Sequence, residues 1–184
     1  MIHHEPSKGK LLLAEPFMND PNFKRSVVFL CEHNEQGTMG FIINKKTELS
    51  LNDVVLDFPD FDAPVYFGGP VQPNTLQFLH RGNPIENSIE ILDGIYWGGS
   101  FEELKSLMNM GAVKSEDFLF LVGYCGWDED QLKFEMTSKS WVIADANEAI
   151  LFNENPNSLW NEVMRKLGKK YAVMASFPED PSLN

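Results

Sequence analysis

Two cysteines and two histidines are the side chains best suited to covalent chemistry. Cys125 lies in residues 123–127, which we expect to form a turn between a buried strand at 118–122 and a following helix. A helix N-terminus lowers the pKa of a thiol, so Cys125 is a candidate nucleophile with His33 or His80 as its base. The turn lacks the second glycine of the Gly-x-Ser-x-Gly elbow. We therefore favour the alternative, a small residue that fills a tight turn.

A metal site is the second chemical hypothesis. Cys31 and His33 alternate along a predicted strand, so both side chains are expected on one face. Cys125 and His80 could complete a Cys₂His₂ set. The spacing matches no compact zinc signature, and a buried Cys31 beside a hydrogen-bonded His33 explains the same residues. We predict no metal and no cofactor.

A binding surface is the third hypothesis. Trp127 is followed directly by Asp128-Glu129-Asp130, which places an acidic helix start beside an aromatic residue. Buried aromatic anchors often dominate interfaces, although most tryptophans lie in the core of a domain. Trp127, Asp128 and Asp130 are therefore our candidate surface for a protein partner or a small cationic ligand.

Composition limits the classes of partner. The formal net charge of −12 disfavours direct binding to a phosphate backbone. The basic residues gather only at Arg165-Lys166 and Lys169-Lys170, where they also match the end of a predicted helix. Two cysteines are too few for a disulfide framework, and no stretch approaches the length of a membrane span. We expect a soluble, cytoplasmic protein without membrane contact, and the sequence leaves homo-oligomers open.

The elements that must position these residues mix without a regular βαβ alternation. That pattern predicts an α+β fold in one domain, residues 1–184, with loosely ordered ends at 1–8 and 172–184. The strongest signals are a central hairpin in residues 23–44 and a capped helix that ends at Gly111. We expect strands at 10–14, 26–33, 39–44, 65–67, 75–80, 89–92, 95–97, 118–122 and 140–144, and helices at 50–58, 100–110, 128–138 and 157–167.

Several motifs resemble those of one bacterial family. They are Gly9–Ala14, Asp20–Val28, Cys31–Asn44, Val65–Val71, and Gly123–Trp127 followed by Gln131-Leu132, Glu135 and Trp141. Their order over nearly the whole chain is similar to that of the YqgE/AlgH family. The resemblance implies an α+β domain with a mixed, barrel-like sheet flanked by helices. It implies no established catalytic activity, and one branch of the family carries a transcriptional-regulator label.

Two positions depart from the family pattern. Lys45-Lys46 stands where the family often has a proline and one basic residue, and the position of Cys125 is commonly alanine or serine. The second departure weakens any role that needs a thiol. We therefore predict a non-enzymatic binding or regulatory protein of unknown partner. The alternative is an enzyme with a Cys/His site around Cys125.

Overall fold

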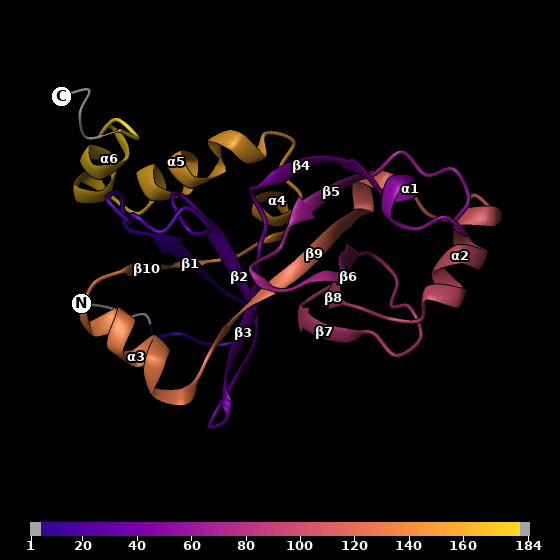
Figure 1. Cartoon of the computed structure of the whole chain (residues 1–184), viewed down its shortest axis with the longest axis horizontal. Helices are drawn as coiled ribbons and strands as arrows, with labels where there is room; N and C mark the ends of the chain where they lie inside the picture. The colour runs from indigo at the N-terminus through magenta and orange to yellow at the C-terminus, as the bar shows by residue number, and fades with distance from the viewer. Residues whose placement is uncertain (1–4, 181–184) are drawn as a thin grey trace.

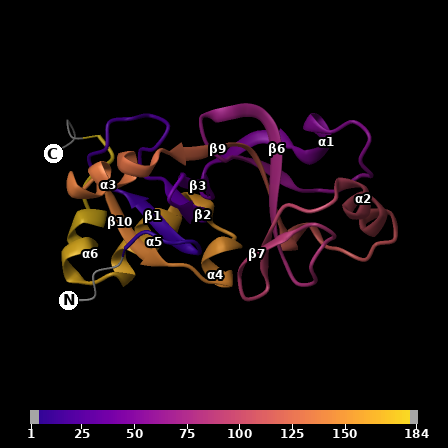
Figure 2. The same cartoon turned by 90° about the horizontal axis from the view of Figure 1, so that it is seen from below.

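The computed structural model describes residues 5–180 of the chain. One ten-stranded sheet runs in the order β10-β1-β2-β3-β9-β6-β8-β7, and β5 pairs with both β4 and β9. Helices α3, α5 and α6 lie toward one end of the molecule, and α1 and α2 lie toward the other (Figures 1 and 2). The strands are β1 Lys10–Ala14, β2 Val27–Asn34, β3 Gly37–Ile42, β4 Lys46–Ser50, β5 Pro64–Phe67, β6 Val71–Arg81, β7 Ile89–Leu92, β8 Ile95–Trp97, β9 Phe118–Trp127 and β10 Trp141–Asp145. The helices are α1 Leu51–Val54, α2 Phe101–Asn109, the short 3₁₀ turn Ser115–Asp117, α3 Glu129–Thr137, α4 Glu148–Leu151, α5 Pro156–Lys166 and α6 Lys169–Ala175.

The central hairpin of β2 and β3 is covered on both faces. Val28 and Leu30 pack in one hydrophobic cluster, whereas Val27 and Phe29 pack in another. Successive side chains of a strand point to opposite faces, so a strand covered on both sides is apolar at every position. The nearly continuous apolar sequence of this hairpin therefore reports its central place in the sheet.

Helices α5 and α6 cover one of these faces. Trp160 of α5 is 1% exposed, and its indole N–H donates to the Ala14 carbonyl at 2.9 Å. A third cluster lies at the other end of the sheet, where Leu104 of α2 packs with Phe78 and Phe120. The long strands β6 and β9 connect the two ends, and their pairing is the most extensive in the molecule.

The fold confirms the predicted α+β class with a mixed sheet. β5 runs parallel to β9, and the other strand pairs are antiparallel. The expectation of a barrel-like sheet is wrong, because the sheet is not closed. The last strands in the sheet order, β10 and β7, are not paired with each other among the described residues, although Leu92 of β7 lies close to Gly9, next to β1.

Two segments differ from the sequence prediction. Residues 123–127 continue β9 rather than forming a turn, because β3 pairs with them as far as Trp127. Gly123, at φ +72°, permits a close backbone crossing, and a Cβ there would lie 2.1 Å from the Gly69 carbonyl oxygen. The tail predicted to be loose from residue 172 is helical as far as Ala175, whose side chain is buried in the core.

Some expectations fall outside what the structure describes. The predicted looseness of residues 1–4 and 181–184 lies beyond the described residues.

The helix predicted at 50–58 is confined to α1, where Ser50 and Asp53 form a capping box. Within residues 5–180, no helix has both the length and the apolar character needed to cross a bilayer.

Candidate functional site

Cys125 does not occupy the environment that the nucleophile hypothesis requires. It lies inside β9, is 0% exposed, and its thiol donates to the Gly68 carbonyl at 3.4 Å. Burial raises the pKa of Cys125 to about 12, against opposing effects of the Ile42 backbone and Lys45. The helix predicted from Asp128 is present, with Asp128 as the N-cap of α3, but Cys125 lies before that cap, inside β9.

The other candidate ligands and bases are dispersed. Cys31 sits at a β-bulge of β2 and is buried, and burial raises the pKa of its thiol far above the ordinary range. His33 is exposed at the strand end, and its Nδ1 lies 2.7 Å from Thr38 Oγ1. His80 is buried on β6 between the rings of Tyr96 and Phe118. Among the described residues, no three His, Cys, Asp or Glu side chains could hold one metal ion, so the Cys₂His₂ set considered as a hypothesis is not assembled.

A carboxylate held by two indoles marks the best-formed polar site. Glu135 Oε2 accepts the indole N–H of Trp127 at 2.9 Å and that of Trp141 at 2.7 Å. Glu135 Oε1 accepts the side-chain amide of Gln131 at 3.0 Å. Gln131 and Glu135 share a face of α3 because they are four residues apart. The three donors fix the carboxylate against the ends of β9 and β10.

A connector, residues 15–26 between β1 and β2, forms the wall opposite this carboxylate. The Phe23 ring meets Trp141 edge-on at 5.5 Å between centroids and lies 6.3 Å from Trp127. Asp20 caps the turn by accepting the Asn22 amide on Oδ1 at 2.9 Å. The connector therefore presents an aromatic ring and a carboxylate to the same space.

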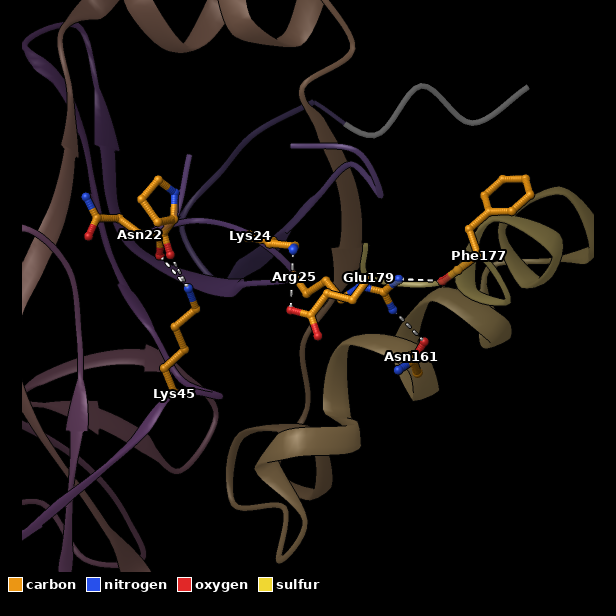
Figure 3. Close-up of polar contacts among 8 residues, drawn as sticks. Asn22, Lys24, Arg25, Lys45, Asn161, Phe177 and Glu179 are labelled. Carbon is orange, nitrogen blue, oxygen red and sulfur yellow. Dashed lines mark hydrogen bonds and ion pairs between the residues drawn. The ribbon is translucent and has the colours of Figure 1, made fainter. Parts of the chain in front are cut away.

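Residues that follow β3 hold the connector in place. Asn44 accepts the Val27 amide at 2.8 Å and donates to the Arg25 carbonyl at 2.9 Å. The Lys45 ammonium donates to the carbonyls of Pro21 at 3.1 Å and Asn22 at 2.7 Å (Figure 3). Burial lowers the pKa of Lys45, and Asp20 opposes that shift.

The C-terminal arm, residues 176–180, holds the connector from its other side. Arg25 donates to the Phe177 carbonyl at 2.5 Å and to Asn161 at 3.4 Å (Figure 3). Its guanidinium lies 4.6 Å from the Trp160 ring centroid, and Lys24 lies 3.9 Å from Glu179. Arg25 has φ +51°, a left-handed conformation that costs a non-glycine residue energy. These contacts compensate for that backbone strain.

The space between the connector, β9 and α3 is a cavity of about 430 Å³, which we call the tryptophan pocket. Asp20 and Glu135 are its acidic residues, and no lysine or arginine among residues 5–180 lines it. Aromatic faces and fixed carboxylates together favour a cation over an anion. The residues lining it from these elements and from β10 are Met18, Asp20, Phe23, Gly126, Trp127, Gln131, Glu135 and Trp141.

The three residues predicted to form a binding surface do not all lie in this pocket. Trp127 lines the tryptophan pocket but is only 5% exposed, whereas Asp128 and Asp130 are exposed outside it. The sequence analysis missed the roles of Glu135 and Phe23. The spacing of Gln131 and Glu135 does indicate that the two side chains share one face of a helix. The two indole donors could not be predicted, because they come from strands that only the fold brings together.

Comparisons with known proteins give the same picture as the motifs. A family model described as AlgH-like matches residues 11–172. A UPF0301 protein of Cytophaga hutchinsonii is 44% identical over 180 residues, covering 97% of this chain and 99% of that protein. A UPF0301 protein of Chlorobium luteolum is 44% identical over 177 residues, covering 96% of this chain and 94% of that one.

Two solved structures share the fold. The solution structure of the AlgH protein from Pseudomonas aeruginosa superposes with a TM-score of 0.72 at 32% identity, covering 97% of this chain and 98% of that one. A crystal structure of a Corynebacterium diphtheriae protein gives a TM-score of 0.81 at 21% identity, covering 96% and 95% of the two chains, and so shares the fold alone. The match of the family model, together with relatives similar over nearly their whole length, shows that the chain belongs to the AlgH-like family.

Proposed function

We propose that this chain is a non-enzymatic binding protein whose tryptophan pocket takes a cationic group. The observation that carries the proposal is the carboxylate of Glu135, fixed by Trp127 and Trp141 in a pocket without a basic residue. All three of its donors are neutral, so they orient the carboxylate without cancelling its charge. Glu135 takes part in none of the ion pairs found in residues 5–180.

The bonding capacity of Glu135 also supports a cationic ligand. A carboxylate offers about four acceptor positions, and three protein donors occupy Glu135 here. One position is left for a donor from outside. A guanidinium or ammonium group would supply that donor together with the missing positive charge, and it could also lie against the face of Phe23.

The alternative of a Cys/His enzyme receives less support. Cys125 is buried in a strand, and burial raises its pKa to about 12, so a thiolate is disfavoured at neutral pH. For the regulatory part of the prediction, we propose action through a partner rather than through DNA, which the net charge of −12 supports. We also propose a cytoplasmic location, which two free buried thiols support.

Calorimetry with a matched pair of probes tests the proposal. N-acetyl-arginine amide carries a guanidinium, and N-acetyl-citrulline amide is its neutral analogue of nearly the same shape. We expect only the arginine derivative to bind, and Glu135→Gln to weaken it by about fivefold, equivalent to about 1 kcal/mol. Equal binding of both probes would contradict the proposal.

A second variant guards against an effect of Glu135→Gln on folding. Asp20→Asn keeps the side-chain oxygen that accepts the Asn22 amide and removes one charge from the pocket. It should also weaken the arginine derivative without changing the melting temperature. Unchanged affinity in both folded variants would show that the pocket carboxylates do not bind the cation.

A further inference from the structure

Two more hollows continue the tryptophan pocket around the start of α3. The hairpin hollow, about 250 Å³, lies beside the β2–β3 turn and shares Gly126 and Trp127 with the tryptophan pocket. The α3 hollow, about 700 Å³, lies between that turn and α3 and shares Asn34 with the hairpin hollow. Because neighbouring hollows share lining residues, the three hollows lie next to one another, and together we call them the track.

The whole track is acidic. Glu32 and Asp128 line the hairpin hollow, which has no lysine or arginine. Three more acidic residues, Glu5, Glu35 and Glu129, line the α3 hollow, where Lys133 is the one lysine or arginine in the described part of the chain. Carboxylates therefore recur in all three hollows, whereas a single cationic ligand needs them in one.

Apolar side chains accompany the carboxylates. Phe134 of α3 is 71% exposed and precedes Glu135. It is three residues from Gln131, so the two side chains project from neighbouring positions of α3, although Phe134 does not itself line the tryptophan pocket. Leu132 and Met136 line the α3 hollow on the other side of the helix. An exposed aromatic ring beside a recess is typical of a protein interface.

We infer that the track binds an extended, basic segment of a partner protein, with one arginine or lysine in the tryptophan pocket. The inference rests on the proposed function of that pocket and adds the class of its ligand. An extended chain projects side chains at regular intervals and so supplies several cations to successive hollows. Apolar residues of the segment would cover Phe134 and Met136, which a polyamine would leave exposed. A nucleic acid would be repelled along the whole track.

Fluorescence anisotropy tests the inference with a labelled decapeptide of alternating arginine and leucine. At physiological salt it should bind at least about tenfold more tightly than N-acetyl-arginine amide, because several linked contacts act together. A decapeptide of alternating glutamate and leucine should not bind. Spermidine should displace the arginine peptide only weakly, and displacement as strong as by unlabelled peptide would overturn the inference in favour of a polyamine.

A pair of triple variants locates the binding. Glu35→Gln, Asp128→Asn and Glu129→Gln together remove three charges from the outer track and leave the tryptophan pocket intact. We expect the arginine peptide to bind about three- to tenfold more weakly and N-acetyl-arginine amide to bind unchanged.

The matched control removes three charges elsewhere. Asp57→Asn, Asp60→Asn and Asp62→Asn alter exposed residues after α1, at the opposite end of the molecule from α3 (Figures 1 and 2). This variant should bind the peptide like the parent chain. Equal weakening of peptide binding in both triple variants would show that the net charge of the protein, and not the position of these carboxylates, determines the affinity. That result would overturn the inference.

The outcomes separate the two proposals. No response to N-acetyl-arginine amide would contradict the cationic function of the tryptophan pocket. A response to that probe with no gain for the peptide would contradict only the extended track.

Discussion

The indole N–H of Trp141 donates to Glu135 Oε2 at 2.7 Å, which joins β10 to α3 through one carboxylate oxygen. Trp127 donates to the same oxygen at 2.9 Å. Glu135→Gln replaces one acceptor oxygen by a donor NH₂ group and weakens the remaining acceptor. We expect the free energy of unfolding in urea to fall by about 1–3 kcal/mol.

Gln131→Ala provides the control for that prediction. Gln131 is exposed, and its side chain donates one hydrogen bond, to the other oxygen of Glu135. Its loss should cost about 0.5 kcal/mol. If both variants unfold at the same urea concentration, the two indole bonds contribute nothing beyond the amide bond.

The buried thiol of Cys125 makes stability depend on alkaline pH. In the unfolded chain the thiol ionises near its ordinary pKa of 9.0, whereas burial raises the folded pKa to about 12. Between these values the unfolded state loses a proton that the folded state keeps, so stability falls as pH rises. Cys125→Ala should reduce that slope by up to about 1.4 kcal/mol per pH unit, measured by urea unfolding at pH 9 to 11.

The same variant tests the enzyme alternative. Cys125→Ala should keep the affinity for N-acetyl-arginine amide, and the parent thiols should react with a disulfide reagent only after unfolding. Rapid modification of Cys125 in the folded protein would contradict the buried position.

His80 gives stability the opposite dependence at acid pH. Burial lowers its pKa, a backbone hydrogen bond with Gly98 opposes the shift, and its buried Nε2 has no partner in the described structure. Arg81, Glu103 and Asp117 are the charged residues that line the cavity beside it. Below the ordinary pKa of 6.5 the unfolded state takes up a proton that folded His80 resists, so stability falls as pH falls.

A ring without a titratable nitrogen should remove that loss. His80→Phe keeps an aromatic ring between Tyr96 and Phe118. We expect the difference in unfolding free energy between pH 7 and pH 5 to become smaller in this variant. A difference that is the same in His80→Phe and in the parent chain would contradict the assignment to His80.

Arg25 combines a strained backbone with a stabilising side chain. Arg25→Ala removes the bond to the Phe177 carbonyl but keeps a Cβ at φ +51°, so we expect a loss of about 2 kcal/mol in unfolding free energy. Arg25→Gly should recover about 0.5–1 kcal/mol of it, because glycine accepts that φ without strain. Thermal melting of the two variants measures the difference. Equal melting temperatures would show that the backbone carries no strain.

Local signals in the sequence predict much of the fold. The central hairpin could be predicted from the sequence because β2 and β3 are apolar on both faces. Helix α2 could be predicted because Ser100 is a typical N-cap residue, and in the structure it accepts the Glu103 amide at 3.2 Å. The extension of β9 through Trp127 could not be predicted from the sequence. Gly123 and Gly126 favour a turn locally, whereas pairing with β3 keeps these residues in a strand. Tertiary pairing overrides local preference in strands more readily than in helices.

Only part of the candidate site could be predicted from the sequence. The sequence indicated Trp127 and the acidic start of α3, since these residues are adjacent. It did not indicate Glu135 as the shared acceptor, because Trp127 and Trp141 approach it from different strands. The reactivity of a thiol made Cys125 a candidate nucleophile, and its burial in β9 argues against that role.

The bond between Arg25 and Phe177 joins residues 152 positions apart. During synthesis the connector therefore leaves the ribosome long before the arm that holds it, since chains emerge from the N-terminus. We expect a nascent chain that ends before residue 177 to carry the tryptophan-pocket residues with a connector that Asn44 and Lys45 hold but the C-terminal arm does not. The complete cation site would then form only late in translation, after the residues that line it have been synthesised.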